Sequence, residues 1–147
     1  MQQTMKGEHR GYELDTDLAR IQFQTVHSWL TQTYWSPGVD LETVIRAAEN
    51  SSIVVGAYTS ETQVGYLRII SDRTSFAWVC DVFVHPDHRG QAVARAMLGF
   101  AMAEPEHQGL RRWVLATKDA HGVYEHLGFE PVRAPSRWMV YGSNPPD

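Results

Sequence analysis

Length, composition and charge set the first limits on this chain. Its 147 residues are 43% hydrophobic and include five Trp, six Tyr and five Phe, which suits one domain with a substantial buried core. A formal net charge of −4 gives no general attraction to nucleic acid or to an anionic membrane. We therefore expect neither as a partner, although a local basic patch could still form from Arg89, Arg95, Arg111, Arg112 and Lys118.

We expect a single domain over residues 1–147, with its core at about 12–141 and loosely held ends at 1–10 and 142–147. The N-terminal stretch holds no apolar signal segment, and no later run reaches the length that crosses a bilayer. The single cysteine, Cys80, lies in an apolar run and fits a small core residue better than a nucleophile. These features predict a cytoplasmic protein.

The first third of the chain predicts a short strand and two helices. Residues 11–14 have the pattern of a strand. Apolar residues then recur at helical spacing from Leu18 to Leu30, and they predict an amphipathic helix that is capped by Thr16 or Asp17 and ends near 34–35. After the break at 36–38, Asp40 is placed to cap a second helix that starts at Leu41 and stops at a left-handed Asn50.

The rest of the chain predicts a mixed sheet. Residues 52–58, 64–70 and 78–84 read as three consecutive antiparallel strands. A helix follows Gly90 and stops around Glu104-Pro105. Further elements are a strand at 112–117, a short helix at 120–127 closed by Gly128, and a last strand at 138–141. Because a strand, a helix and a strand follow one another after Trp78, the strands with Phe83 and Val114 should be parallel neighbours.

The most informative stretch is the junction between the strand at 78–84 and the helix after it. A short turn with small residues and an arginine presents free backbone N–H groups together with positive charge, which suits a phosphate. Gly90, Ala92 and Ala94 leave little bulk over the first helical turn, and Arg89 could add charge-assisted hydrogen bonds. The junction predicts a pyrophosphate site; the alternative is an ordinary corner whose small residues only allow close packing.

Two motifs resemble the GNAT superfamily of acyl-CoA-dependent N-acetyltransferases. The run Arg89-Gly90-Gln91-Ala92-Val93-Ala94 resembles the family signature Arg/Gln-x-x-Gly-x-Gly/Ala, with Ala92 in place of the usual central glycine. The strand at 113–117 and the run Tyr124-Glu125-His126-Leu127-Gly128-Phe129 are similar to the family's later strand and its Tyr-Glu-x-x-Gly-Phe helix end. The resemblance covers roughly residues 12–141.

The resemblance implies a fold, a cofactor and the residues that bind it. The GNAT fold is a mixed α+β fold with a mostly antiparallel sheet of six to seven strands, about four helices, and a splayed parallel strand pair that holds the pantetheine arm of acetyl-CoA. The residues implied to bind acetyl-CoA are Phe83 and Val84 on the first splayed strand, the pyrophosphate run Arg89, Gly90, Gln91, Ala92, Val93 and Ala94, and Thr117, where many relatives have asparagine.

Two residues are candidates for proton transfer. By resemblance Tyr124 falls where the family often places a general acid, and its phenol could return a proton to the coenzyme A thiolate; the alternative is a tyrosine that is packed on the sheet and bonded to backbone. Asp81 lies on the same side of its strand as Phe83 by alternation, so it could accept a proton or pair with a cationic amine. A structural Asp bonded to a neighbouring strand or an arginine is the alternative.

The acceptor site is less defined by the sequence. Tyr34 and Trp35 precede a Ser-Pro-Gly break and are candidates for an acceptor wall, because the family's substrate cleft is lined by the loop joining its first helices; the alternative is a pair of aromatic core residues. Arg137 and Trp138 are further candidates. The histidines complete no metal-ligand set, since no cysteine or paired carboxylate accompanies His85 and His88 or His121 and His126, so no metal is expected.

The sequence therefore predicts an N-acetyltransferase. We expect it to move the acetyl group of acetyl-CoA to a primary amine of a small molecule, by direct attack in a ternary complex without a covalent enzyme intermediate. A non-catalytic module that binds or senses acyl-CoA is the alternative. A dinucleotide-binding domain is disfavoured because no Gly-x-Gly-x-x-Gly follows an early strand. The oligomeric state, a homodimer included, stays open.

Overall fold

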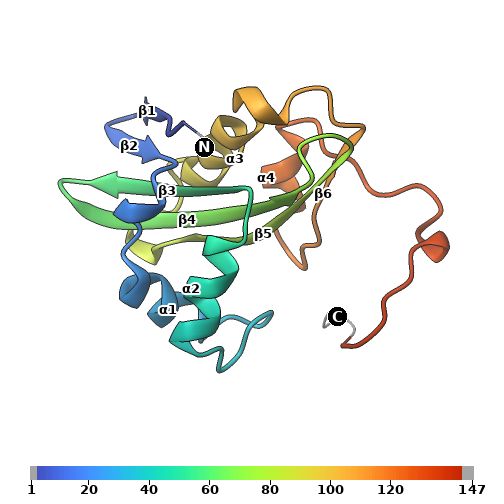
Figure 1. The fold of residues 1–147 in the computed structure, drawn as a ribbon, viewed down its shortest axis with the longest axis horizontal. Coiled ribbons are helices and arrows are strands. Elements are labelled where there is room, and N and C mark those ends of the chain that lie inside the picture. The colour runs from blue at the N-terminus through green and yellow to red at the C-terminus, as the bar shows by residue number, and fades with distance from the viewer. Residues whose placement is uncertain (1–2, 144–147) are drawn as a thin grey trace.

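The computed structural model describes residues 3–143, which form one six-stranded sheet with helices on both faces (Figure 1). The strands lie in sequence order, β1-β2-β3-β4-β5-β6. They are β1 (Lys6–His9), β2 (Tyr12–Asp15), β3 (Ile53–Thr59), β4 (Thr62–Ser71), β5 (Phe76–Val84) and β6 (Arg112–Val114). The α-helices are α1 (Phe23–Leu30), α2 (Leu41–Glu49), α3 (Val93–Met102) and α4 (His121–Glu125). This is the predicted mixed α+β fold with four helices.

Helices α1 and α2 cover one face of the sheet (Figure 1). Each helix buries an apolar stripe, Val26 and Leu30 on α1 and Val44 and Ala48 on α2, against Tyr66 of β4. The predicted cap of α2 is confirmed, because Asp40 Oδ1 accepts the N–H of Thr43 at 2.8 Å. The predicted left-handed stop at Asn50 is wrong: its φ is −94°, and its side-chain amide ends the helix by donating to Arg46 O at 2.8 Å.

The first predicted helix is shorter than its apolar pattern indicates. Asp17 caps only a 3₁₀ turn, Leu18–Arg20, and α1 begins after an extended break at Ile21. At this break the chain bonds to the start of β4 instead: Gln22 donates its N–H to Gln63 Oε1 at 2.8 Å, and Gln63 returns its own N–H to Gln22 Oε1 at 3.2 Å. A tertiary contact 41 residues away therefore overrides the local helical periodicity.

Helix α3 packs on the opposite face and anchors the residues that follow β5. Val93, Met97, Leu98 and Ala101 are buried on α3 and join one core cluster with Val55, Leu67 and Val79 of the sheet. The approach is close at Gly65, where an added Cβ would lie 3.0 Å from the Met97 side chain. Small residues at the contact thus let α3 lie directly on β3 and β4 and fix the position of its first turn.

A β-bulge changes the alternation of β5 at Asp81. This residue has φ +56°, and the register between β4 and β5 shifts between Tyr66 and Arg68. As a result Val79 and Val84 both pack in the α3 core although strict alternation would put them on opposite faces. Asp81 and Phe83 both face the α1 side, where they contact Trp35 and Trp29 respectively. Their predicted common side is confirmed.

The parallel pair at the end of the sheet is short. β5 and β6 pair only through Phe76↔Arg112, Ala77↔Trp113 and Trp78↔Val114. Beyond these pairs β6 ends, while β5 continues to Val84. The predicted parallel neighbours are confirmed, but Val114 lies opposite Trp78 and not near Phe83, and the strand predicted at 112–117 ends at Val114. The sheet therefore has a gap between two diverging strands.

The two ends of the chain differ from the prediction. The prediction of a loose segment at 1–10 is wrong for Lys6–His9, which form the strand β1 and pair antiparallel with β2 from Lys6↔Asp15 to His9↔Tyr12. The polar residues of β1 give no strand pattern, because this edge strand depends on backbone pairing more than on an apolar face. The strand predicted at 138–141 is also wrong. A 3₁₀ turn, Pro135–Arg137, turns the chain away from the sheet (Figure 1), and Tyr141 is fully exposed.

Residues 142–143, at the start of the predicted loose tail, form a bend without regular structure. The rest of that tail, 144–147, lies outside the described residues. None of the helices between residues 3 and 143 combines the length and the apolar composition needed to cross a membrane.

One buried hydroxyl gives a stability prediction. Tyr66 is fully buried, and its hydroxyl has no hydrogen-bond partner among residues 3–143. Since a buried hydroxyl without a partner costs about 1 kcal/mol or more, Tyr66→Phe should raise the free energy of unfolding by about 1 kcal/mol in urea titrations. Tyr12→Phe is the matched control: its hydroxyl is bonded to His88 Nδ1 at 2.9 Å, so removing it should destabilise the fold.

The same residue predicts a pH dependence. Burial raises the pKa of Tyr66 above the ordinary value near 10. A raised pKa means that the neutral phenol's contribution to stability is complete below pH 10 and is lost as the pH rises through the raised value. Tyr66→Phe should therefore lose less stability than the parent above pH 10. An equal loss in both proteins would show that Tyr66 does not ionise on unfolding.

Candidate active site

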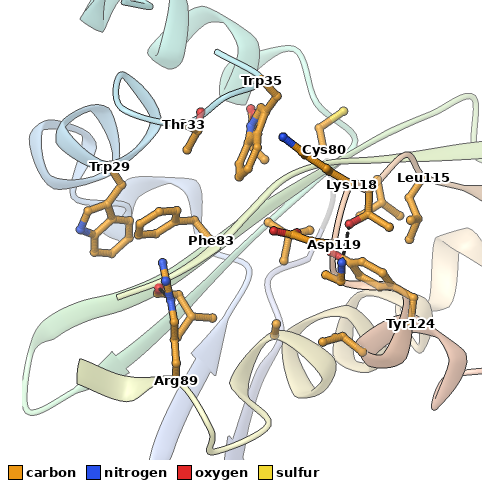
Figure 2. A pocket seen from close by; sticks show the side chains of 18 of the residues that line it. Trp29, Thr33, Trp35, Cys80, Phe83, Arg89, Leu115, Lys118, Asp119 and Tyr124 are labelled. Carbon is orange, nitrogen blue, oxygen red and sulfur yellow. Dashed lines mark hydrogen bonds between the residues drawn. The ribbon is translucent and has the colours of Figure 1, made fainter. Parts of the chain in front are cut away.

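A cleft of about 1520 Å³ lies at the gap between β5 and β6. Residues from both faces of the sheet line it, for example Trp29 of α1 and Val93 of α3. Figure 2 shows Phe83 and Arg89 on one side of the cleft and Asp119 and Tyr124 on the other. Of the predicted site residues, Gln91, Arg137 and Trp138 do not line this cleft. The others do: they are Tyr34, Trp35, Asp81, Phe83, Val84, Arg89, Gly90, Ala92, Val93, Ala94, Thr117 and Tyr124.

The first turn of α3 presents backbone donors to the cleft. Its N-cap, Ala92, is in the left-handed region and supplies no side-chain cap, and the first N–H bonded back into the helix is that of Ala96, to Ala92 O at 3.0 Å. The N–H groups that precede Ala96 in the first turn are therefore free for a ligand. Gly90 has φ +82°, and no atom lies within 4 Å of the position of an added Cβ. The turn is open to a phosphate.

Positive charge lies beside these donors. Arg89 donates its Nε to Val84 O at 2.9 Å, and its guanidinium carbon lies 5.3 Å from the centre of the Phe83 ring. The side chain is thus fixed at the end of β5 and extends toward Phe83 (Figure 2). A guanidinium in this position can add charge-assisted hydrogen bonds to an anion that is held by the helix N-terminus.

The end of the sheet supports the turn through contacts that the sequence did not predict. The carbonyl of Gln91 is bonded to His9 Nε2 at 2.8 Å, and Tyr12 OH is bonded to His88 Nδ1 at 2.9 Å. His9 ends β1, and Tyr12 begins β2. Gln91 therefore does not line the cleft. Its backbone carbonyl, bonded to His9, holds the turn in place.

β5 has an open edge toward the gap. The N–H of His85 is bonded to Val64 O of β4 at 2.8 Å. Since successive residues of a strand direct their N–H and C=O groups to opposite sides, those of Val84 point away from β4 and into the gap. Phe83 directs its backbone toward its partner Tyr66 on β4 and its ring toward Trp29, at a centroid distance of 5.1 Å.

Tyr124 reaches the cleft from α4. Its side chain is 9% exposed and contacts the edge of the Phe129 ring. Burial, followed by the nearby Tyr34 and Asp119, raises the pKa of Tyr124 to about 12. The phenol therefore keeps its proton throughout the neutral range. Thr117 helps to position α4, because its Oγ1 accepts the N–H of Ala120 at 3.1 Å at the start of the helix.

Asp81 is bonded through both carboxylate oxygens. Oδ2 accepts from Arg68 Nε at 2.7 Å, and Oδ1 accepts from Trp35 Nε1 at 2.9 Å. The arginine bond that the sequence left as an alternative is thus present. Each oxygen still has a lone pair, so the carboxylate can accept one more hydrogen bond from the cleft.

Tyr34 and Trp35 are surface residues of the loop between α1 and α2. They are 40% and 38% exposed, so the alternative of two core residues is wrong. Tyr34 OH accepts the N–H of Lys118 at 3.1 Å, which follows β6, whereas Trp35 donates to Asp81 on β5. Two consecutive side chains therefore connect the loop to β5 and to the segment that follows β6.

Comparison with known proteins places this geometry in a family. Residues 12–129 match the model of the Acetyltransferase (GNAT) family. The chain belongs to the GNAT family. A protein from Xanthomonas campestris pv. campestris assigned to that family is 37% identical in sequence, with a TM-score of 0.87 over 92% of this chain and 96% of the other. This GNAT protein is an acetyltransferase, and acetyl-CoA is the donor of the family.

Other relatives are more distant. A protein of Gibberella zeae inferred to be an acetyltransferase is 27% identical and aligns with 83% of this chain and 81% of its own length. A protein of Clostridium acetobutylicum inferred to be an acetyltransferase, with a crystal structure that contains acetyl-CoA, has a TM-score of 0.65 over 97% of this chain and 96% of its own. At 16% identity it supports the fold alone.

The departure from the GNAT signature at Ala92 gives a prediction. A non-glycine residue in the left-handed region costs roughly 1 kcal/mol, and Ala92 has φ +59°. Ala92→Gly should therefore raise the free energy of unfolding by about 1 kcal/mol and bind acetyl-CoA as well as or better than the parent, as measured by urea titration and calorimetry. Ala96→Gly, within α3 and outside the cleft lining, is the control and should only destabilise. A clear loss of affinity in Ala92→Gly would show that the diphosphate binds elsewhere.

Several cleft residues of this GNAT protein were not predicted. They are Trp29, Arg68, Lys118 and Asp119. Their positions in the sequence do not indicate a site, because Trp29 fits the apolar stripe of α1 and Lys118-Asp119 has the composition of an ordinary polar turn. Cys80 also lines the cleft, but burial raises the pKa of its thiol to about 11, so it is not a thiolate at neutral pH. Among residues 3–143 no three His, Cys, Asp or Glu side chains form a metal site.

Proposed function

We propose that this GNAT protein transfers the acetyl group of acetyl-CoA to a primary amine of a small molecule, by direct attack in a ternary complex. One observation carries the proposal. The uncapped first turn of α3 and the protonated phenol of Tyr124 line the same cleft at the diverging strands β5 and β6. The gap thus offers an anion site at one end and a proton donor at the other.

The residues divide into binding roles. The first turn of α3 and Arg89 bind the paired phosphates, and Val84 offers its N–H along the open edge of β5 to the pantetheine arm. Thr117, whose Oγ1 is already an acceptor for Ala120, retains its hydroxyl proton as a donor. The ring of Phe83 faces Trp29 on the acceptor side. When bound, acetyl-CoA supplies an activated thioester, whose sulfur leaves as the amide bond forms.

Tyr124 and Asp81 take the catalytic roles. Tyr124 donates its hydroxyl hydrogen to the leaving sulfur and regains a proton from the amine nitrogen, which loses one as the amide bond forms. The raised pKa of about 12 supports this role by keeping the phenol protonated before the reaction. Asp81 is paired with Arg68, so we assign it to bind the cationic amine through a free lone pair. The amine then releases one proton to solvent water and attacks as the neutral form. Direct attack requires no nucleophilic side chain, and the buried Cys80 is unsuited to be one.

Mixing the protein with acetyl-CoA and a panel of amines tests the proposal. The expected result is micromolar to millimolar affinity for acetyl-CoA and release of free coenzyme A thiol that depends on the amine. Binding without release from any amine would favour the non-catalytic sensing module. No binding at all would overturn both functions. The cytoplasmic location, the homodimeric state and the absence of a metal stay predictions.

A further inference from the structure

The acceptor end of the cleft has a fixed aromatic wall. Tyr34 and Trp35 each carry a polar group at the far end of the ring, and each polar group is bonded: Tyr34 OH to Lys118 N–H at 3.1 Å, and Trp35 Nε1 to Asp81 Oδ1 at 2.9 Å. The two rings also contact each other edge to face at 5.0 Å. We name this pair the Tyr34–Trp35 clasp. Because each side chain is held by a hydrogen bond as well as by the backbone, the clasp offers preorganised aromatic rings.

A second aromatic pair lies on the same face of the cleft. Trp29 and Phe83 are stacked at a centroid distance of 5.1 Å and an interplanar angle of 19°. Figure 2 shows the Trp35 ring and the Trp29–Phe83 pair around the same opening. The clasp and this pair therefore give the acceptor end four aromatic side chains, which favour a ligand with a flat apolar body.

The charges around the opening restrict the ligand further. Among the described residues that line the cleft, the only carboxylates are Asp81 and Asp119, whereas the lining cations are Arg68, Arg89, Arg95 and Lys118. Arg68 is bonded to Asp81, and Lys118 lies over the Tyr34 ring at 5.6 Å. One ammonium group can bind at Asp81. Because four lining cations outnumber the two lining carboxylates, a second positive charge on the ligand is disfavoured.

We infer that the acceptor is a primary amine with a flat aromatic body and a single positive charge. This inference rests on the proposed function and deepens it. The amine approaches Asp81, and its body lies between the clasp and the Trp29–Phe83 pair. Polyamines and aminoglycosides, which carry several ammonium groups and no aromatic surface, do not match these walls.

Matched amines test the inference on the full chain. With acetyl-CoA saturating, kcat/KM for phenethylamine should exceed kcat/KM for n-butylamine by about tenfold or more, because stacking adds to the apolar contact. Spermidine should be slower than both. Cyclohexylethylamine separates a flat body from a merely apolar one, and it should fall between the two monoamines.

Variants of the clasp test whether Trp35 selects amines that carry an aromatic ring. Trp35→Leu should lower the ratio of phenethylamine to butylamine activity to about one, with acetyl-CoA affinity unchanged. Trp35→Phe keeps a ring without the bond to Asp81, so it should keep most of the ratio while raising the KM for every amine. Trp138→Leu is the matched control, because Trp138 is 43% exposed and does not line the cleft; it should change nothing.

The outcomes distinguish the two proposals. If acetyl-CoA binds and spermidine or butylamine reacts as fast as phenethylamine, the inference is overturned and the proposed function stands. If acetyl-CoA binds and no aromatic amine reacts, the inference is overturned as well. If acetyl-CoA does not bind, the proposed function fails first, and the acceptor assignment fails with it.

Discussion

Tyr124→Phe should lower kcat by about 100-fold and leave the affinity for acetyl-CoA unchanged. A positioned general acid contributes about 10²-fold or more, and the variant removes only the hydroxyl of a side chain that is 9% exposed. The phenol pKa of about 12 lies above the value of about 8.5 for a thiol. Tyr124 is therefore expected to donate a hydrogen bond to the leaving sulfur and to give up its proton only as another proton replaces it.

The pH profile separates this role from packing. Because the pKa is raised, the active neutral form persists as the pH increases, and kcat should show no loss from Tyr124 between pH 7 and about 11. Single-turnover rates with bound acetyl-CoA provide the measurement. Tyr141→Phe, at a fully exposed tyrosine, is the control and should keep full activity. An unchanged kcat in Tyr124→Phe across this range would remove Tyr124 from the mechanism.

Arg68→Met should destabilise the fold by about 2 kcal/mol and raise the KM for the amine. Arg68 and Asp81 are only 17% and 12% exposed, and their N–O distance is 2.7 Å. Removing the arginine leaves a carboxylate without its counter-charge, which costs about 3 kcal/mol or more in a fully buried pair and less here. The KM rises because Asp81 also holds Trp35. Urea titration and initial rates measure the two effects.

A double-mutant cycle tests the origin of that loss. Asp81→Asn removes the charge and keeps the shape, and asparagine tolerates the left-handed φ of +56° at this position. Arg68→Met combined with Asp81→Asn should therefore be more stable than the sum of the single effects. Simple additivity would mean that the ion pair contributes nothing. Arg133→Met, which breaks an exposed pair with Glu130, should change stability little.

The sequence predicted those parts of the fold that local patterns determine. The central hairpin is one example, since two apolar, β-rich runs specify β3 and β4. The polar turn between them contains Ser60 and Glu61, both with positive φ. The α3 turn is another, because small residues after an apolar strand leave the helix N-terminus open. The capping of α2 by Asp40 depends on a side chain three residues from its partner, which the sequence displays directly.

The remaining parts depend on contacts between distant segments. β1 is polar and gains its stability from pairing with β2, and α1 starts late because Gln22 bonds to Gln63. The strand expected at 138–141 has the right residue types, yet the turn at Pro135–Arg137 directs it away from the sheet. In the site, the bonds of Asp81 to Arg68 and Trp35 connect three segments, and no spacing within one segment could indicate them.

The short pairing of β6 with β5 lowers the local stability of the segment that follows β5 in the sheet. Only three residue pairs tie β6 to the sheet, and α4 with Tyr124 follows from that strand. The segment from 112 to 129 should therefore detach as a unit at a lower free energy than the central strands, and its amides should exchange with solvent sooner. A molecule that spans the gap, with phosphates on α3 and its thioester beside Tyr124, would bind both halves, so the donor itself should slow this local opening before the amine arrives.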